Sequence, residues 1–250
     1  MSKAFDYLNR LGQFVSTNPN VLCLLGLGSM SEISRMDAYS DMDFFLIVET
    51  GHKQAFISDL SWLAVEPILF QFRNTRDGYK VLFKGDVFAE FAVFEAEELP
   101  EIAFTEGKVI FAKSSFDLNW IVPKKVPNIQ RRSSEFLMNE ALTNLYIGLK
   151  RDHRGETASA FTFIQVYASG LISELFQDIY PTKPILIDPF VSERRIENRF
   201  VEAFDTLSTF KQGYTKNRES AKAAVTFLKT HFNPNEAMVQ TILELCDSSL

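Results

Sequence analysis

The fold of this 250-residue chain is indicated by Leu24-Leu25-Gly26-Leu27-Gly28-Ser29 and, eleven residues further on, by Asp41-Met42-Asp43-Phe44-Phe45-Leu46-Ile47-Val48. Each stretch contains a short apolar run of the length typical of a buried β-strand. Two glycines close the first run, and two acidic residues open the second. Because residues two apart in a strand face the same side, we expect Asp41 and Asp43 to project their carboxylates together.

A pair of adjacent carboxylates is costly unless a cation lies between them. Carboxylate oxygens are hard ligands, which favour Mg²⁺ or Mn²⁺. A third acid, Glu90, lies inside the apolar strand pattern Phe88 to Phe94. We therefore predict that Asp41, Asp43 and Glu90 are metal ligands and catalytic residues. The simpler alternatives stay open, namely a solvated turn at the two aspartates and an exposed or paired acid on an edge strand at Glu90.

Gly28 and Ser29 follow the first strand and precede a predicted helical turn. Backbone N–H groups and a hydroxyl at such a point can hold phosphate oxygens. Lys150 and Arg154 are basic residues at a predicted helix end, where cations interact favourably with the helix dipole. They are also candidates for neutralising triphosphate charge. A phosphate-binding turn close to a metal pair indicates phosphoryl or nucleotidyl transfer.

The first half of the chain predicts a mixed α/β arrangement. Apolar residues at helical spacing predict a helix over Lys3–Ser16, and a second is expected over Gln54–Val65. The expected strands are Val21–Leu25, Phe44–Val48, Pro67–Phe72, a hairpin of Tyr79–Phe83 with Val87–Phe94, and Lys108–Ala112.

Long helical patterns replace the strand signals from Ser133 onward. The expected helices are one through Phe136 and Leu149, then Thr157–Ile179, Ser192–Phe210, Lys216–His231 and Asn235–Leu245. The prolines at 123 and 127 indicate a linker. We expect an α+β protein with a mixed-sheet domain over residues 1–125 and an all-helical bundle domain over residues 126–250.

These motifs resemble the nucleotidyltransferase superfamily, which has a DNA polymerase beta-like fold. Within it, the group of lincosamide and aminoglycoside antibiotic nucleotidyltransferases is the most similar. The shared sequence motifs are Gly28-Ser29, then Tyr39-Ser40-Asp41-Met42-Asp43-Phe44, then Glu90-Phe91, and a basic helix end followed by Gly155-Glu156. The loop between Ser29 and Asp41 departs from the group because it lacks glycine.

The resemblance implies transfer of a nucleoside monophosphate from ATP, or another nucleoside triphosphate, to a hydroxyl of a small molecule, with release of pyrophosphate. An antibiotic acceptor, and therefore antibiotic resistance, is one case. Asp41 and Asp43 would ligate Mg²⁺ or Mn²⁺, and Glu90 would complete a metal site or take the hydroxyl proton. Gly28, Ser29, Lys150 and Arg154 would bind the triphosphate. The active site is expected between the two domains.

The net charge of −6 argues against nonspecific binding to nucleic acid or an anionic membrane. No apolar run approaches the roughly 20 residues of a membrane span, and two cysteines without metal or disulfide spacing fit a reducing compartment, so we expect a cytoplasmic protein. Two other classes remain alternatives: a non-catalytic binding or antitoxin-like regulatory protein with this fold, and a phosphotransferase. The sequence leaves the oligomeric state open, with a homodimer as one alternative.

Overall fold

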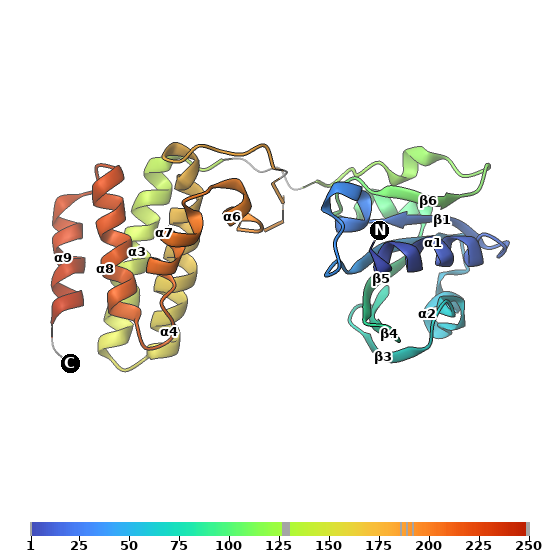
Figure 1. Ribbon diagram of the computed structural model, residues 1–250, viewed down its shortest axis with the longest axis horizontal. Coiled ribbons are helices and arrows are strands. Elements are labelled where there is room, and N and C mark those ends of the chain that lie inside the picture. Colours follow the sequence, from blue (N-terminus) through green and yellow to red (C-terminus); the bar gives the residue numbers. More distant parts are fainter. Residues whose placement is uncertain (1, 127–130, 186, 189, 192, 249–250) are drawn as a thin grey trace. The chain divides into compact units, whose positions relative to one another are not determined.

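The computed structural model describes residues 2–126, 131–185, 187–188, 190–191 and 193–248. The chain divides into two compact units, Met1–Pro127 and Asn128–Leu250, each with its own hydrophobic core. The first unit contains a β-sheet with helices, and the regular elements described in the second are helices, so the fold is α+β (Figure 1). None of the described helices combines the length and apolar character needed to cross a bilayer.

The first unit is built on a six-stranded mixed sheet with the order β3-β4-β5-β2-β1-β6. Its strands are β1 (Val21–Gly26), β2 (Met42–Val48), β3 (Ile68–Arg73), β4 (Gly78–Phe83), β5 (Val87–Glu95) and β6 (Lys108–Ala112). The two central strands, β2 and β5, pair in parallel, and the other neighbours pair antiparallel. All the strands expected from the sequence are therefore confirmed, with small shifts at their ends.

Helix α1 (Lys3–Val15) covers one face of this sheet, and its apolar side points inward. The Ser2 hydroxyl accepts a hydrogen bond from the Phe5 N–H at 3.2 Å, which satisfies one of the free donors of the first turn. Leu8 and Leu11 are fully buried three residues apart, as the sequence spacing requires. The predicted first helix is thus confirmed.

The two faces of the sheet are separated by the alternation of side chains along β2. Met42, Phe44 and Leu46 point into the larger core under α1. Phe45 and Ile47 face the opposite side, where a smaller cluster forms with Leu99, Phe104 and Phe116 from the segment after β5. Asp43 shares that second face by alternation.

The helix expected over residues 54–65 is wrong in its length. Helix α2 covers only Lys53–Ser58, and a 3-10 turn, η3, follows over Ser61–Leu63. Asp59 causes the break because its carboxylate accepts hydrogen bonds from the Ser61 N–H at 2.9 Å and the Ser61 hydroxyl at 2.8 Å. Trp62 then donates to the Phe56 carbonyl at 2.9 Å, which closes the end of α2.

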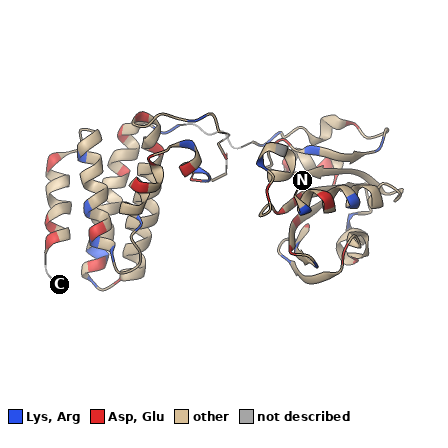
Figure 2. Cartoon of the chain, viewed as in Figure 1, with Lys and Arg blue, Asp and Glu red and all other residues tan. Residues whose placement is uncertain are grey.

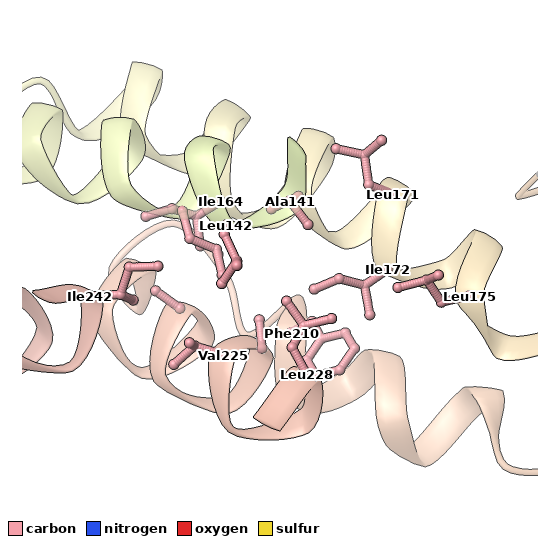
Figure 3. Packing of buried hydrophobic residues seen from close by; sticks show 14 of the residues in the cluster. Ala141, Leu142, Ile164, Leu171, Ile172, Leu175, Phe210, Val225, Leu228 and Ile242 are labelled. Carbon is pink, nitrogen blue, oxygen red and sulfur yellow. The ribbon is translucent and has the colours of Figure 1, made fainter. Parts of the chain in front are cut away.

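The second unit is a bundle of helices around one core. The long helices are α3 (Ser134–His153), α8 (Asn217–His231) and α9 (Glu236–Asp247), and the shorter ones are α4 (Thr157–Phe161), α5 (Ser169–Glu174), α6 (Ile196–Arg199) and α7 (Ala203–Phe210). Figure 3 shows side chains from several of these helices meeting, including Leu142 of α3, Ile172 of α5, Phe210 of α7 and Leu228 of α8.

One helix predicted for this unit is continuous but changes its hydrogen-bonding pattern along its length, and another is broken into two. The segment expected as one helix over 157–179 contains a π-helical turn, Thr162–Ala168, between α4 and α5. The helix expected over 192–210, whose first residue lies outside the described residues, is two short helices, because Phe200 adopts an extended conformation between them. Phe200 is buried against Phe176, with ring centroids 6.0 Å apart, so tertiary packing outweighs helix continuity here.

Helix α8 carries charged residues of both signs, most of them basic, whereas the charged residues of α9 are all acidic (Figure 2). Lys222 of α8 pairs with Asp247 of α9 at 2.7 Å, and Lys229 pairs with Glu236 at 2.8 Å. Both pairs are exposed to solvent, so each contributes little to stability, typically about 0–1 kcal/mol.

Candidate active site

Asp43 and Glu90 lie opposite each other on the parallel strands β2 and β5. Residues at the same register position of neighbouring strands point to the same face of the sheet, at an interstrand spacing of roughly 4.8 Å. Farther along the same face, Phe45 and Ile47 are covered by the smaller hydrophobic cluster. Asp43 is half-buried and Glu90 is exposed, so the two acids lie on the open part of this face.

Asp41 immediately precedes β2 and is exposed. Its backbone carbonyl accepts a hydrogen bond from the Ser29 hydroxyl at 3.4 Å, which links the loop after β1 to the start of β2. Among the residues that the structure describes, no three His, Cys, Asp or Glu side chains are grouped closely enough to hold a metal ion. The metal role of Asp41, Asp43 and Glu90 therefore stays a prediction.

The turn after β1 brings Gly28 directly against Asp43. The Leu27 N–H donates to the Asp43 carbonyl at 2.8 Å, and a 3-10 turn, η1, then begins at Gly28. Gly28 has φ = 55°, in the left-handed region, and a Cβ at this position would lie 2.8 Å from Asp43 Oδ2. Only glycine fits here without strain, so the Gly28-Ser29 turn and Asp43 are brought together as the sequence suggested.

The Glu90 carboxylate has two partners that the sequence analysis missed. Lys80 Nζ lies 3.2 Å from Oε2, and the Asn74 side-chain amide donates to Oε1 at 2.9 Å. Lys80 is opposite Glu90 in the β4–β5 pairing, and Asn74 directly follows β3. The register of the predicted hairpin could have revealed the Lys80 partner, because pairing Phe83 with Val87 places Lys80 opposite Glu90.

Aromatic side chains continue this row of residues toward the edge of the sheet. Phe72 of β3 lies opposite Lys80, and Phe70 lies opposite Leu82. Both phenylalanines are more than half exposed, at 56% and 54%. The open face thus combines carboxylates and a lysine with an adjacent apolar surface, a combination suited to binding a molecule with charged and apolar parts.

The residues on this face suit a divalent cation by their chemistry. Asp43 and Glu90 offer carboxylate oxygens, the ligands that Mg²⁺ and Mn²⁺ prefer. The missing side chain at Gly28 leaves the backbone of the turn next to Asp43 Oδ2. Two adjacent acids also require positive charge nearby, which Lys80 supplies in part.

The two other predicted phosphate-binding residues, Lys150 and Arg154, belong to the second unit. Lys150 is exposed in the last turn of α3, with Nζ 5.6 Å from the centroid of the Tyr146 ring. Arg154 follows α3 and pairs with Glu156 through Nε at 2.9 Å. Both residues fit the structural alternative of cations at a helix C-terminus. Their proposed contact with a triphosphate stays a prediction.

Seven chains among the solved structures are similar to this chain, including the following two. One is an aminoglycoside 6-adenyltransferase from Bacillus subtilis, with 12% sequence identity and a TM-score of 0.36 over 100% of this chain and 94% of that chain. The other is a nucleotidyltransferase-like protein from Exiguobacterium sibiricum, with 10% identity and a TM-score of 0.31 over 97% of this chain and 76% of that chain. No protein-family model and no curated protein matches the sequence.

Proposed function

We propose that this chain is a metal-dependent nucleotidyltransferase that moves a nucleoside monophosphate from a nucleoside triphosphate to a hydroxyl of a small molecule. The observation that carries the proposal is the position of Asp43, between Glu90 on the neighbouring strand and Gly28 in the turn after β1. Carboxylates beside a glycine turn combine the two requirements of phosphate chemistry, a site for a cation and backbone groups for phosphate oxygens.

Each residue has a role in this proposal. Asp41, Asp43 and Glu90 would hold Mg²⁺ or Mn²⁺, and Gly28 and Ser29 would bind phosphate oxygens. A bound divalent cation supplies Lewis-acid stabilisation of the charge on the phosphates. Lys150 and Arg154 would neutralise further phosphate charge.

In the proposed reaction, the acceptor hydroxyl oxygen forms a bond to the α-phosphorus. The bond between that phosphorus and the oxygen bridging to the β-phosphate breaks, and its electron pair leaves with pyrophosphate. Glu90 is the candidate to take the hydroxyl proton, because its carboxylate lies on the open face of the sheet. The half-exposed Phe70 and Phe72 support an acceptor that has an apolar part besides its hydroxyl.

A second candidate is a non-catalytic protein of the same fold. Both Glu90 oxygens already have protein partners, Lys80 and Asn74, and this observation favours a carboxylate with a structural role. The two candidates differ in nucleotide binding, since a regulatory protein of this kind has no need for a triphosphate.

Calorimetric titration with ATP and with GTP, in the presence and absence of Mg²⁺, separates the candidates. We expect metal-dependent binding by the wild type that is lost in Asp41→Asn and Asp43→Asn. Glu49→Gln is the control, because Glu49 is an exposed acid that directly follows β2, at the opposite end of that strand from Asp43. Absence of nucleotide binding at millimolar concentration would favour the non-catalytic candidate. Binding would justify screening hydroxylated acceptors for pyrophosphate release, as opposed to the diphosphate release of a phosphotransferase.

A further inference from the structure

Glu90 is held by two side chains of the neighbouring hairpin. Lys80 Nζ forms an ion pair with Glu90 Oε2 at 3.2 Å, and the Asn74 amide donates a hydrogen bond to Glu90 Oε1 at 2.9 Å. Asn74 Oδ1 is buried and accepts no hydrogen bond from the described part of the chain, so Glu90 is the one side-chain partner shown for this amide. The conformation of the Glu90 carboxylate therefore depends on Lys80 and Asn74.

Three charged residues form a row across three strands. Asp43 of β2 lies opposite Glu90 of β5, which lies opposite Lys80 of β4. The row carries two negative charges and one positive charge, and Lys80 offsets the repulsion between neighbouring acids. Lys80 lies on the side of Glu90 away from Asp43. Because its ammonium partly neutralises the Glu90 carboxylate, it weakens the attraction of Glu90 for any other cation.

We propose that the Lys80 ammonium pairs with the Glu90 carboxylate in the metal-free protein, and that it pairs instead with a phosphate of the nucleotide when Glu90 ligates a divalent cation. This inference rests on the proposed nucleotidyltransferase function and adds a positioning residue to it. Lys80 leaves Glu90 in the bound state because an ammonium and a divalent cation repel each other at one carboxylate.

The side chain of Lys80 is suited to such a movement. Its relative exposure is 40%, so the ammonium is not enclosed by packing. Four flexible methylene groups carry three donors, and the ammonium can therefore change partner while β4 stays in place. The β4 backbone is held by pairing on both sides, to β3 and to β5.

The test compares two affinities in Lys80→Met, which keeps most of the apolar stem and removes the charge. Mn²⁺ affinity without nucleotide is measured on the full chain from the electron paramagnetic resonance signal of free Mn²⁺, and affinity for ATP with Mg²⁺ is measured by calorimetry. We expect Mn²⁺ to bind about threefold more tightly, because the ion pair that competes for Glu90 is lost. We expect ATP to bind about threefold more weakly, because the proposed ion pair between Lys80 and a phosphate is lost; each change is the size expected for one exposed ion pair. The opposite signs distinguish exchange of partners from a structural role, which would weaken both.

Lys84→Met is the matched control. Lys84 is exposed in the turn that follows β4, and its loss changes the net charge equally without touching the contact to Glu90. We expect both affinities to stay at the wild-type value in this variant and in Lys80→Arg, which retains the charge. In the Glu90→Gln background, Lys80→Met should no longer tighten Mn²⁺ binding, since the effect acts through Glu90.

The outcomes separate this inference from the proposed function. Mn²⁺ and ATP binding by the wild type, with Lys80→Met equal to Lys84→Met or weaker in both affinities, overturns the role of Lys80 alone. Absence of Mn²⁺ and ATP binding in the wild type and in every variant overturns the proposed function and the role of Lys80 with it. Circular dichroism of each variant shows whether it is folded.

Discussion

The backbone of Gly28 packs against the carboxylate of Asp43, so closely that a Cβ at Gly28 would lie 2.8 Å from Asp43 Oδ2. Gly28→Ala should therefore displace the Asp43 carboxylate and abolish nucleotide binding. Gly51→Ala is the matched control, because Gly51 also has a positive φ, 84°, but has no atom within 4 Å of the added Cβ. Both variants should lose about 1 kcal/mol of folding free energy from backbone strain. Equal nucleotide affinity in the two variants, measured by calorimetry, would contradict the role of the turn.

Asp77 should make the first unit sensitive to acid. Its carboxylate pairs with Lys53 Nζ at 2.7 Å. Burial alone raises the pKa of Asp77, but the hydrogen bonds and charges of Lys53 and Arg76 outweigh it, and the pKa lies below its ordinary value of 3.8. The stabilisation is therefore fully present above that ordinary value and is lost as the pH falls through the lower pKa of the folded state.

Asp77→Asn should reduce the free energy of unfolding at pH 7 by roughly 1.5–3 kcal/mol, the range for hydrogen bonds to charged groups. The difference from the wild type should shrink as the pH falls below about 4, because the carboxyl of the unfolded chain protonates first and that of the folded protein follows only at lower pH. Urea unfolding at a series of pH values measures this. Asp86→Asn, in an exposed turn, is the control. A difference that persists unchanged in acid would show that Asp77 acts through packing instead of charge.

Gly148 should resist the substitution that helix propensity favours. It lies inside α3, where alanine is normally more stable than glycine by about 1 kcal/mol. A Cβ at this position would, however, lie 2.5 Å from Ile164 Cγ1 in the core of the second unit, and overpacking typically costs about 1–3 kcal/mol. We expect Gly148→Ala to lower the thermal unfolding midpoint.

Gly170→Ala, in α5, is the comparison, since its added Cβ would meet only the end of the Glu193 side chain, at 2.9 Å. That side chain can move, so this variant should be as stable as the wild type or more so. A stabilising effect of Gly148→Ala in the same calorimetric scan would contradict the packing described around Ile164.

Both cysteines should be unreactive in the folded protein. Burial raises the pKa of the Cys23 thiol to about 12, and burial together with the charge of Asp247 raises that of Cys246 to about 11. Because the thiolate is the nucleophile, a disulfide reagent at pH 8 should label neither residue rapidly in the native state and both after unfolding. If part of the labelling of the native protein is fast, the variants Cys23→Ala and Cys246→Ala show which cysteine reacts. Rapid labelling of Cys23 in the native protein would be inconsistent with its burial between strands.

Much of the fold was predictable from patterns within single segments. The apolar spacing of α1, the alternation along β2 and the extent of β6 are repeated in the structure. The errors occurred where one local contact or one buried side chain overrides a periodic pattern. Asp59 ends α2 by bonding to Ser61, and Phe200 interrupts a helix to reach Phe176.

For the candidate site, the sequence by itself determined the two-residue spacing of Asp41 and Asp43 and the position of Gly28 just beyond a strand. These features depend on covalent spacing within one segment, which the periodicity of a strand converts directly into geometry. Only the tertiary structure decided that Glu90 lies opposite Asp43, and that Lys80 and Asn74 hold its carboxylate. Those contacts depend on which strands become neighbours in the sheet. Strand order is set by burial of the whole apolar surface and not by any single stretch of sequence.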